Sequence, residues 1–147
     1  MKLILTAIFI CFYLSTLNLA QDGSQAKVAE NGYTWLSLSQ PTNKLTDHKH
    51  NYLASILDNQ KLRKLSGKKT PLLFNCDNDL TKLTESDKSD QVSLDIVVKM
   101  IDNFYSNKEN LVIPVLGAYC YCIKELSGMD SKELEKYRQE LLNYSKE

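Results

Sequence analysis

Hydrophobic residues recur at helical spacing along much of this 147-residue chain, and the spacing predicts where its helices lie. Side chains three and four positions apart share one face of an α-helix, so an apolar stripe at that spacing indicates a helix packed on a core. One such stripe runs from Asp47 to Ser66. Thr46 or Asp47 can cap its first turn, and Gly67 stands where a helix commonly ends in a left-handed residue. The sequence therefore predicts a helix from Asp47 to Ser66.

Two further stripes follow in the second half of the chain. The clearer one predicts an amphipathic helix that begins at Ser89 or Asp90, with apolar positions Val92, Ile96, Val97, Met100, Ile101 and Phe104. The other predicts a last helix that begins at Ser131, with Leu134, Tyr137, Leu141 and Leu142 on one face. Near the start, Tyr33–Leu38 predicts a short helix or turn between Asn31-Gly32 and Pro41.

Leu111–Ile123 is the most apolar stretch beyond the first twenty residues, and it predicts a central helix. Pro114 is compatible with a first helical turn, where its missing N–H costs nothing. The alternative is a pair of strands, which the Val-Ile-Pro-Val run and the alternating segment Tyr119–Cys122 would also suit. With a helix here, we expect an all-α fold, a compact bundle of four to five helices.

A mostly polar connection from Gly67 to Asp90 separates the helices of the first half from those of the second. It carries Pro71 and a short apolar run, Leu72–Phe74, so we expect a loop with at most one turn of helix. Connections of this length in a compact domain are usually functional or tied down. Cys76 lies at its centre and offers a tether.

The first twenty residues have the pattern of a secretory signal peptide. Lys2 precedes the apolar run Leu3–Leu14, and Ala20 is a small residue suited to cleavage. A spanning helix would need about twenty apolar residues, and an uncleaved membrane anchor is the alternative. We expect an exported chain that begins near Gln21, forms a single helical domain over residues 21–147, and has no membrane contact after the signal is removed.

Export places the cysteines in an oxidising compartment, where disulfides form and persist. Cys11 leaves with the signal peptide, so Cys76, Cys120 and Cys122 remain and allow one intramolecular bridge. Residues two apart on a helix point about 200° apart, so only one of the last two can meet Cys76. Cys122 lies on the core stripe, which makes Cys76–Cys122 the first choice and Cys120 the alternative. The leftover thiol is expected to be buried or to pair between chains.

Charge and motifs exclude several functional classes. Lys and Arg number 18 against 18 Asp and Glu, so there is no basic excess of the kind that nucleic-acid binding requires. The one basic cluster, Lys61–Lys69, is expected to be a solvated helix end. His48 and His50 sit together at a predicted helix start and lack the spacing of a metal or catalytic site. We therefore expect no enzyme, no metal and no cofactor.

Several segments resemble the Rap/Tai family of type VI secretion amidase immunity proteins. Gln91–Ile101, followed after a polar turn by Ile113–Leu116 and an apolar helix, resembles the second half of that family. Gly32–Leu36 and Asn51–Asp58 resemble its first two helices more weakly. The resemblance covers most of the chain beyond the leader. Two features depart from it: the family commonly has a cysteine where Gly128 stands, and its loop cysteine is usually nearer the third helix.

The resemblance implies a periplasmic, all-helical protein, often a homodimer, which binds a secreted peptidoglycan amidase effector and blocks its active-site cleft. Inhibitors of this kind insert a loop or helix end into the cleft, and a few anchors supply most of the affinity. The long connection is the candidate here, because its carboxylates and amides could approach a catalytic Cys-His pair. The predicted contact residues are Asp77, Asn78, Asp79, Thr81 and Glu85.

Two other classes of protein fit the same sequence. A small periplasmic helical chaperone or stress protein would shield apolar surfaces of its clients and would expose an apolar patch of its own. A secreted carrier of a small apolar ligand would enclose a cavity. The residues expected to line that cavity are Ile96, Met100, Leu116, Tyr119 and Ile123, which otherwise pack as core.

Overall fold

A computed structural model of the chain describes residues 30–39, 48–85 and 93–147, so the proposed signal peptide and the cleavage site near Gln21 lie outside the described residues. The described residues form six α-helices and two short 3-10 helices, with no strand beyond an isolated bridge between Asn31 and Pro114. The predicted all-α fold is confirmed. The strand pair considered around Pro114 is wrong, because Val115–Leu126 is a helix.

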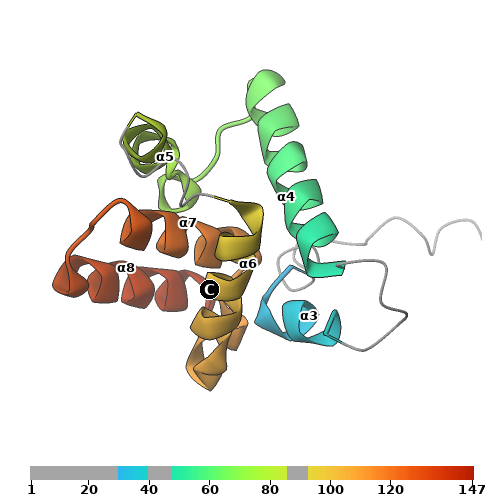
Figure 1. Cartoon of the computed structure of the whole chain (residues 1–147), viewed down its shortest axis with the longest axis vertical. Coiled ribbons are helices and arrows are strands. Elements are labelled where there is room, and N and C mark those ends of the chain that lie inside the picture. The colour runs from blue at the N-terminus through green and yellow to red at the C-terminus, as the bar shows by residue number, and fades with distance from the viewer. Residues whose placement is uncertain (1–29, 40–47, 86–92) are drawn as a thin grey trace, which may run out of the picture.

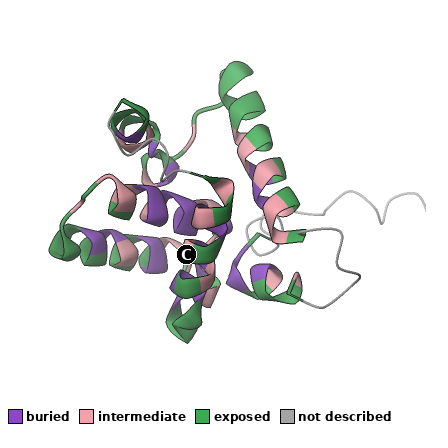
Figure 2. Cartoon of the chain, in the orientation of Figure 1, coloured by how far each residue is buried: buried purple, intermediate pink, exposed green. Residues whose placement is uncertain are grey.

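Helices α6 (Leu94–Ser106), α7 (Val115–Leu126) and α8 (Ser131–Tyr144) pack together, with α7 at the centre (Figure 1). Most of α7 is buried on several sides at once, whereas its neighbours bury one stripe each (Figure 2). Burial of apolar surface on this central helix stabilises the fold by about 25 cal/mol per Å² removed from water. The fully enclosed residues of α7 include Val115, Ala118, Cys120 and Ile123.

The starts of α6 and α7 differ from the prediction for local reasons. Helix α6 begins at Leu94, and the Ser93 hydroxyl caps it by accepting a hydrogen bond from the backbone N–H of Ile96. The expected start at Ser89 or Asp90 falls within residues 86–92, which lie outside the described part of the chain. Helix α7 begins after Pro114, and Lys108–Val112 forms the 3-10 helix η3. A residue that precedes proline is pushed out of the helical region, so the apolar run is split.

Helices α3 (Gly32–Ser37) and α4 (His48–Leu65) complete the first half of the described chain. The Asn31 side chain caps α3, and a Cβ at Gly32 would come within 2.6 Å of the Tyr105 ring, so only glycine lets the backbone approach this closely. Helix α4 matches its prediction to within one residue at each end. Gly67 has φ +74°, the left-handed conformation expected of a helix terminator.

The connection after α4 contains more helix than predicted. A 3-10 turn, η1 (Leu72–Phe74), leads into α5 (Asp77–Thr84), a helix of eight residues where we expected a loop with at most one turn. Its start is favoured by Asp77 and Asp79, since acidic side chains stabilise the first turn of a helix. The buried Leu83 and the half-buried Leu80 pack α5 against the body of the fold, the core built around α7.

One disulfide tethers this connection, but the predicted choice of cysteine is wrong. Cys76 pairs with Cys120, with 5.4 Å between their Cα atoms, and Cys122 is a free, buried thiol. The two α7 cysteines do point in different directions, as expected. Because α7 is central, both side chains point into the core. The position of Cys122 on an apolar stripe therefore did not distinguish it from Cys120.

None of the helices in the described part of the chain combines the length and apolar character that a bilayer-spanning segment needs.

Candidate functional site

Helix α5 carries the predicted contact residues, but the structure divides them into two groups. Asp79 faces the body and accepts a hydrogen bond from the Lys124 ammonium at 2.7 Å, with both side chains about one-seventh exposed (13% and 14%). Lys82 lies 3.9 Å from the same carboxylate. A carboxylate that is this buried and paired holds two helices together and is not available to a partner.

Asp77 also has a structural role. Its carboxylate accepts hydrogen bonds from the Lys64 ammonium at 2.6 and 2.7 Å, which joins the end of α4 to the start of α5. Its backbone N–H donates to the Asn75 side chain. The pair is partly exposed, so it contributes little to stability, yet it fixes how α5 meets α4.

The remaining predicted residues, Asn78, Thr81 and Glu85, are exposed. They are spaced three and four positions apart, so they follow one outer row of α5. The Thr81 hydroxyl donates to the backbone carbonyl of Asp77, which leaves its methyl group and oxygen lone pairs at the surface. The structure therefore gathers three of the five predicted residues on one accessible face.

Two exposed leucines lie in the segments that precede α5 in the chain. Leu65 at the end of α4 is 76% exposed and Leu72 in η1 is 89% exposed. The Lys64–Asp77 ion pair and a hydrogen bond from Gln60 to the Thr70 hydroxyl hold this part of the chain against α4. We call the face formed by Leu65, Leu72, Asn78, Thr81 and Glu85 the apical surface.

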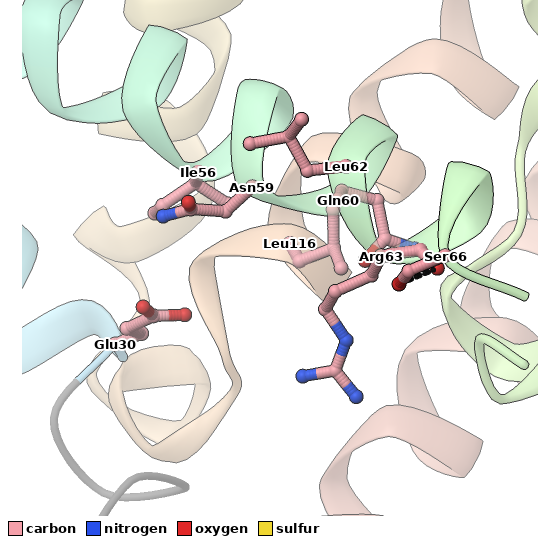
Figure 3. A pocket seen from close by; sticks show the side chains of 8 residues that line it. All are labelled: Glu30, Ile56, Asn59, Gln60, Leu62, Arg63, Ser66 and Leu116. Atoms are coloured by element: carbon pink, nitrogen blue, oxygen red, sulfur yellow. Dashed lines mark hydrogen bonds between the residues drawn. The ribbon is translucent and has the colours of Figure 1, made fainter. Parts of the chain in front are cut away.

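A second feature, which the sequence did not reveal, is a groove between α4 and the start of α7 (Figure 3). Its volume of about 540 Å³ falls within the range of small-ligand pockets. It carries an acidic and a basic side chain, two amides, a hydroxyl and three apolar side chains. The lining residues are Glu30, Ile56, Asn59, Gln60, Leu62, Arg63, Ser66 and Leu116.

The described residues offer little catalytic chemistry. They contain no cluster of three or more side chains suited to hold a metal ion. The Cys122 thiol is 1% exposed, and burial raises its pKa, so it stays protonated and unreactive at neutral pH. His50 lies 3.7 Å from the Asp95 carboxylate at the surface of the molecule.

Four of the residues named for a ligand cavity are divided between the core and two surface pockets. Tyr119 and Ile123 belong to the buried core. Leu116 lines the groove of Figure 3, whereas Met100 lines a separate surface pocket of about 310 Å³ beside Arg138. The carrier hypothesis gains no support from this arrangement.

Comparison of the chain with protein-family models, with curated proteins and with solved structures gives no match.

Proposed function

We propose that this protein acts by binding, as an exported immunity protein that occludes the active-site cleft of a type VI secreted peptidoglycan amidase in the periplasm. The target class is the one implied by the sequence resemblance to the Rap/Tai family. The contact region that we propose is the apical surface.

The observation that carries the proposal is that α5 is rigidly held yet exposes an entire row. The Cys76–Cys120 disulfide precedes its first residue, the Asp79–Lys124 pair holds its inner side, and the Asp77–Lys64 pair fixes its start. An element fixed in this way loses little conformational entropy when it binds, which is the advantage of a preorganised inhibitor.

The leucines of the apical surface add apolar anchors, which the polar row of α5 lacks. Interfaces gain most of their affinity from a few anchors that become fully desolvated, ringed by polar contacts. Leu65 and Leu72 expose more of their surface than the other large apolar residues of the described chain. Their burial against a partner would remove an apolar surface that the fold itself leaves in water.

The test is titration calorimetry of the secreted chain with candidate amidases, combined with rescue of cells that express the amidase in the periplasm. We expect a saturable 1:1 complex and loss of amidase activity. Asn78→Arg, in the exposed row, should weaken binding by about tenfold or more. Asn143→Arg, on the exposed side of α8, is the matched control and should leave binding unchanged.

Absence of a complex with any amidase would refute the proposed target. Equal losses from Asn78→Arg and Asn143→Arg would refute the proposed surface. Sedimentation of the free protein in the same experiments would show whether a homodimer covers Leu65 and Leu72 before the partner does.

The exposed leucines also favour a second candidate, a small periplasmic chaperone. A chaperone would slow the aggregation of several unrelated unfolded clients and would show no saturable stoichiometry with one enzyme. Parallel assays of client aggregation and amidase inhibition separate the two functions.

A further inference from the structure

The groove in Figure 3 presents opposite charges on its two sides. Glu30 stands beside the start of α3, and Arg63 lies on the last turns of α4. In the part of the chain that the structure describes, neither the Glu30 carboxylate nor the Arg63 guanidinium forms a hydrogen bond or an ion pair, although both line the same hollow. Each can therefore receive a complementary charge without breaking an existing contact.

The wall between these charges carries amides. Asn59 extends its side chain over the groove on the side of Glu30 (Figure 3). Gln60 uses its NH₂ group to donate to the Thr70 hydroxyl, which fixes the amide and leaves its carbonyl oxygen as an acceptor. Side-chain amides can donate and accept at once, which matches the alternating N–H and C=O groups of a peptide backbone.

Apolar side chains form the rest of the surface. Ile56 is 5% exposed and Leu116 is half-buried, whereas Leu62 is 62% exposed and stands at the rim. A site with an apolar floor and a few directional polar groups is the usual composition of a small-ligand pocket.

We propose that this groove binds a short zwitterionic peptide in extended form. The peptide's terminal carboxylate would bind the Arg63 guanidinium, which suits planar carboxylates better than an ammonium does. Its ammonium group would bind the Glu30 carboxylate, and its backbone would meet Asn59 and Gln60. Small side chains fit best, because Ile56 and Leu116 already fill the floor. This inference is independent of the proposed function and requires no amidase.

The probe is tetra-alanine, used with free termini and in three capped forms: N-acetylated, C-amidated, and both. Binding to the secreted chain is measured by calorimetry and by NMR of the side-chain amides. We expect the free peptide to bind and to shift the Asn59 and Gln60 signals. Each cap should weaken binding between about tenfold and a hundredfold, the range for one lost charged hydrogen-bonding partner.

Two variants locate the charges. Arg63→Gln should weaken the free peptide by a similar factor and should remove the effect of C-terminal amidation. Glu30→Gln should do the same for N-terminal acetylation. Lys61→Gln, an exposed cation on the same helix that does not line the groove, is the control and should change neither.

The proposal is overturned if the four peptides bind equally or not at all, or if Lys61→Gln weakens binding as much as Arg63→Gln. Binding that depends on the carboxylate alone would make the groove an anion site and would also refute the zwitterion. The capping series uses the unaltered protein, so the test holds even if a variant fails to fold.

Discussion

Polar side chains around the central helix α7 are shielded from solvent, whereas those at the outer end of α4 are exposed. Around α7, Lys124, Asn110 and Arg138 are largely shielded from solvent, and each has a protein partner. Along residues 61–69, every residue is exposed, leucines and cations alike (Figure 2). The polar groups around α7 are part of the architecture, because a buried group without a partner costs about twice what a typical hydrogen bond contributes. At the outer end, Lys64 pairs with Asp77 and the Ser66 hydroxyl donates to a backbone carbonyl, whereas the Arg63 guanidinium is available to other molecules.

The turn that follows α6 shows how the body satisfies its polar groups. The Asn110 amide is 3% exposed, donates to the backbone carbonyl of Phe104 and accepts from Arg138. The Tyr105 hydroxyl donates to the carbonyl of Ile113. Burial raises the pKa of Tyr105, so this donor stays protonated at neutral pH. These bonds fix the chain between α6 and α7.

Loss of the Cys76–Cys120 disulfide should have the largest effect on stability. The bridge closes a loop with a sequence separation of 44 residues, for which the chain-entropy estimate is about 4 kcal/mol. Reduction of the native protein should lower its free energy of unfolding by that order, measured by urea denaturation with and without dithiothreitol. Cys122→Ala should keep this sensitivity to reduction, whereas the double variant Cys76→Ala/Cys120→Ala should lose it. Equal stability of the oxidised and reduced protein would contradict the role given to the bridge.

Substitution of Asp102 should have the next largest effect on stability, because this residue of α6 binds side chains from both α3 and α4. Its carboxylate accepts hydrogen bonds from the Trp35 indole N–H at 2.7 Å and from the Lys49 ammonium at 2.5 Å. Trp35 is fully buried and Lys49 is 14% exposed on its side chain, so Asp102→Ala leaves two shielded donors unpaired. We expect a loss of about 2–3 kcal/mol in the free energy of unfolding.

The neighbouring exposed position tests that assignment. Asn103→Ala should cost less than about 0.5 kcal/mol in the same denaturation assay. Asp102→Asn keeps an acceptor for Trp35 and removes the charge opposite Lys49, so its loss should be intermediate. If Asp102→Ala were no worse than Asn103→Ala, α3 and α4 would be held by apolar packing alone.

Helices whose determinants are local could be predicted from the sequence. Helix α4 was bounded correctly by its periodicity and by Gly67, and the start of α8 at Ser131 was predicted from its apolar face. The Asp130 side chain caps α8. Helix α5 was missed because its eight residues include only two apolar ones, Leu80 and Leu83, too few to define a stripe. It is stabilised by burial of Leu83 and by the Asp79–Lys124 pair between α5 and α7. The cysteine pairing also depends on three-dimensional position, since both directions from α7 are buried.

The candidate site divides in the same way. Asn78, Thr81 and Glu85 were predicted from chemistry and from loop length, and they are exposed as a contact surface requires. Asp77 and Asp79 were proposed by the same argument, but their partners Lys64 and Lys124 lie on other helices. The groove joins Glu30, Arg63 and Leu116 from three separate segments, and no local pattern signals such a meeting.

A smaller effect is expected from Glu135, whose carboxylate accepts hydrogen bonds from Arg138 and Gln139. The Arg138 bond is the largest cause that lowers the pKa of Glu135 from 4.5 to about 2. A lowered folded-state pKa stabilises the protein above about pH 4.5, and that contribution is lost as the pH falls toward 2. The Glu135 side chain is 54% exposed, so the loss should stay below about 1 kcal/mol. An NMR titration of Glu135 should give a midpoint near 2, and Arg138→Gln should return it toward 4.5.

The smallest effect on folding is expected at the leucines of the apical surface. Leu65→Ser and Leu72→Ser should change the free energy of unfolding by less than about 0.5 kcal/mol, because both side chains are in water in the folded chain. Leu53→Ala is the comparison on the same helix. Leu53 is fully buried, so its truncation should cost about 2–5 kcal/mol in the same denaturation experiment.

Substitution of these leucines should affect binding more than it affects folding. If the apical surface contacts a partner, Leu65→Ser and Leu72→Ser should weaken the complex although they leave the fold intact, whereas Val112→Ser, at a less exposed apolar position on η3, should not. A marked loss of stability from Leu65→Ser would show that this side chain is buried in the folded protein. The outer end of α4 would then belong to the core, and its contrast with the body around α7 would disappear.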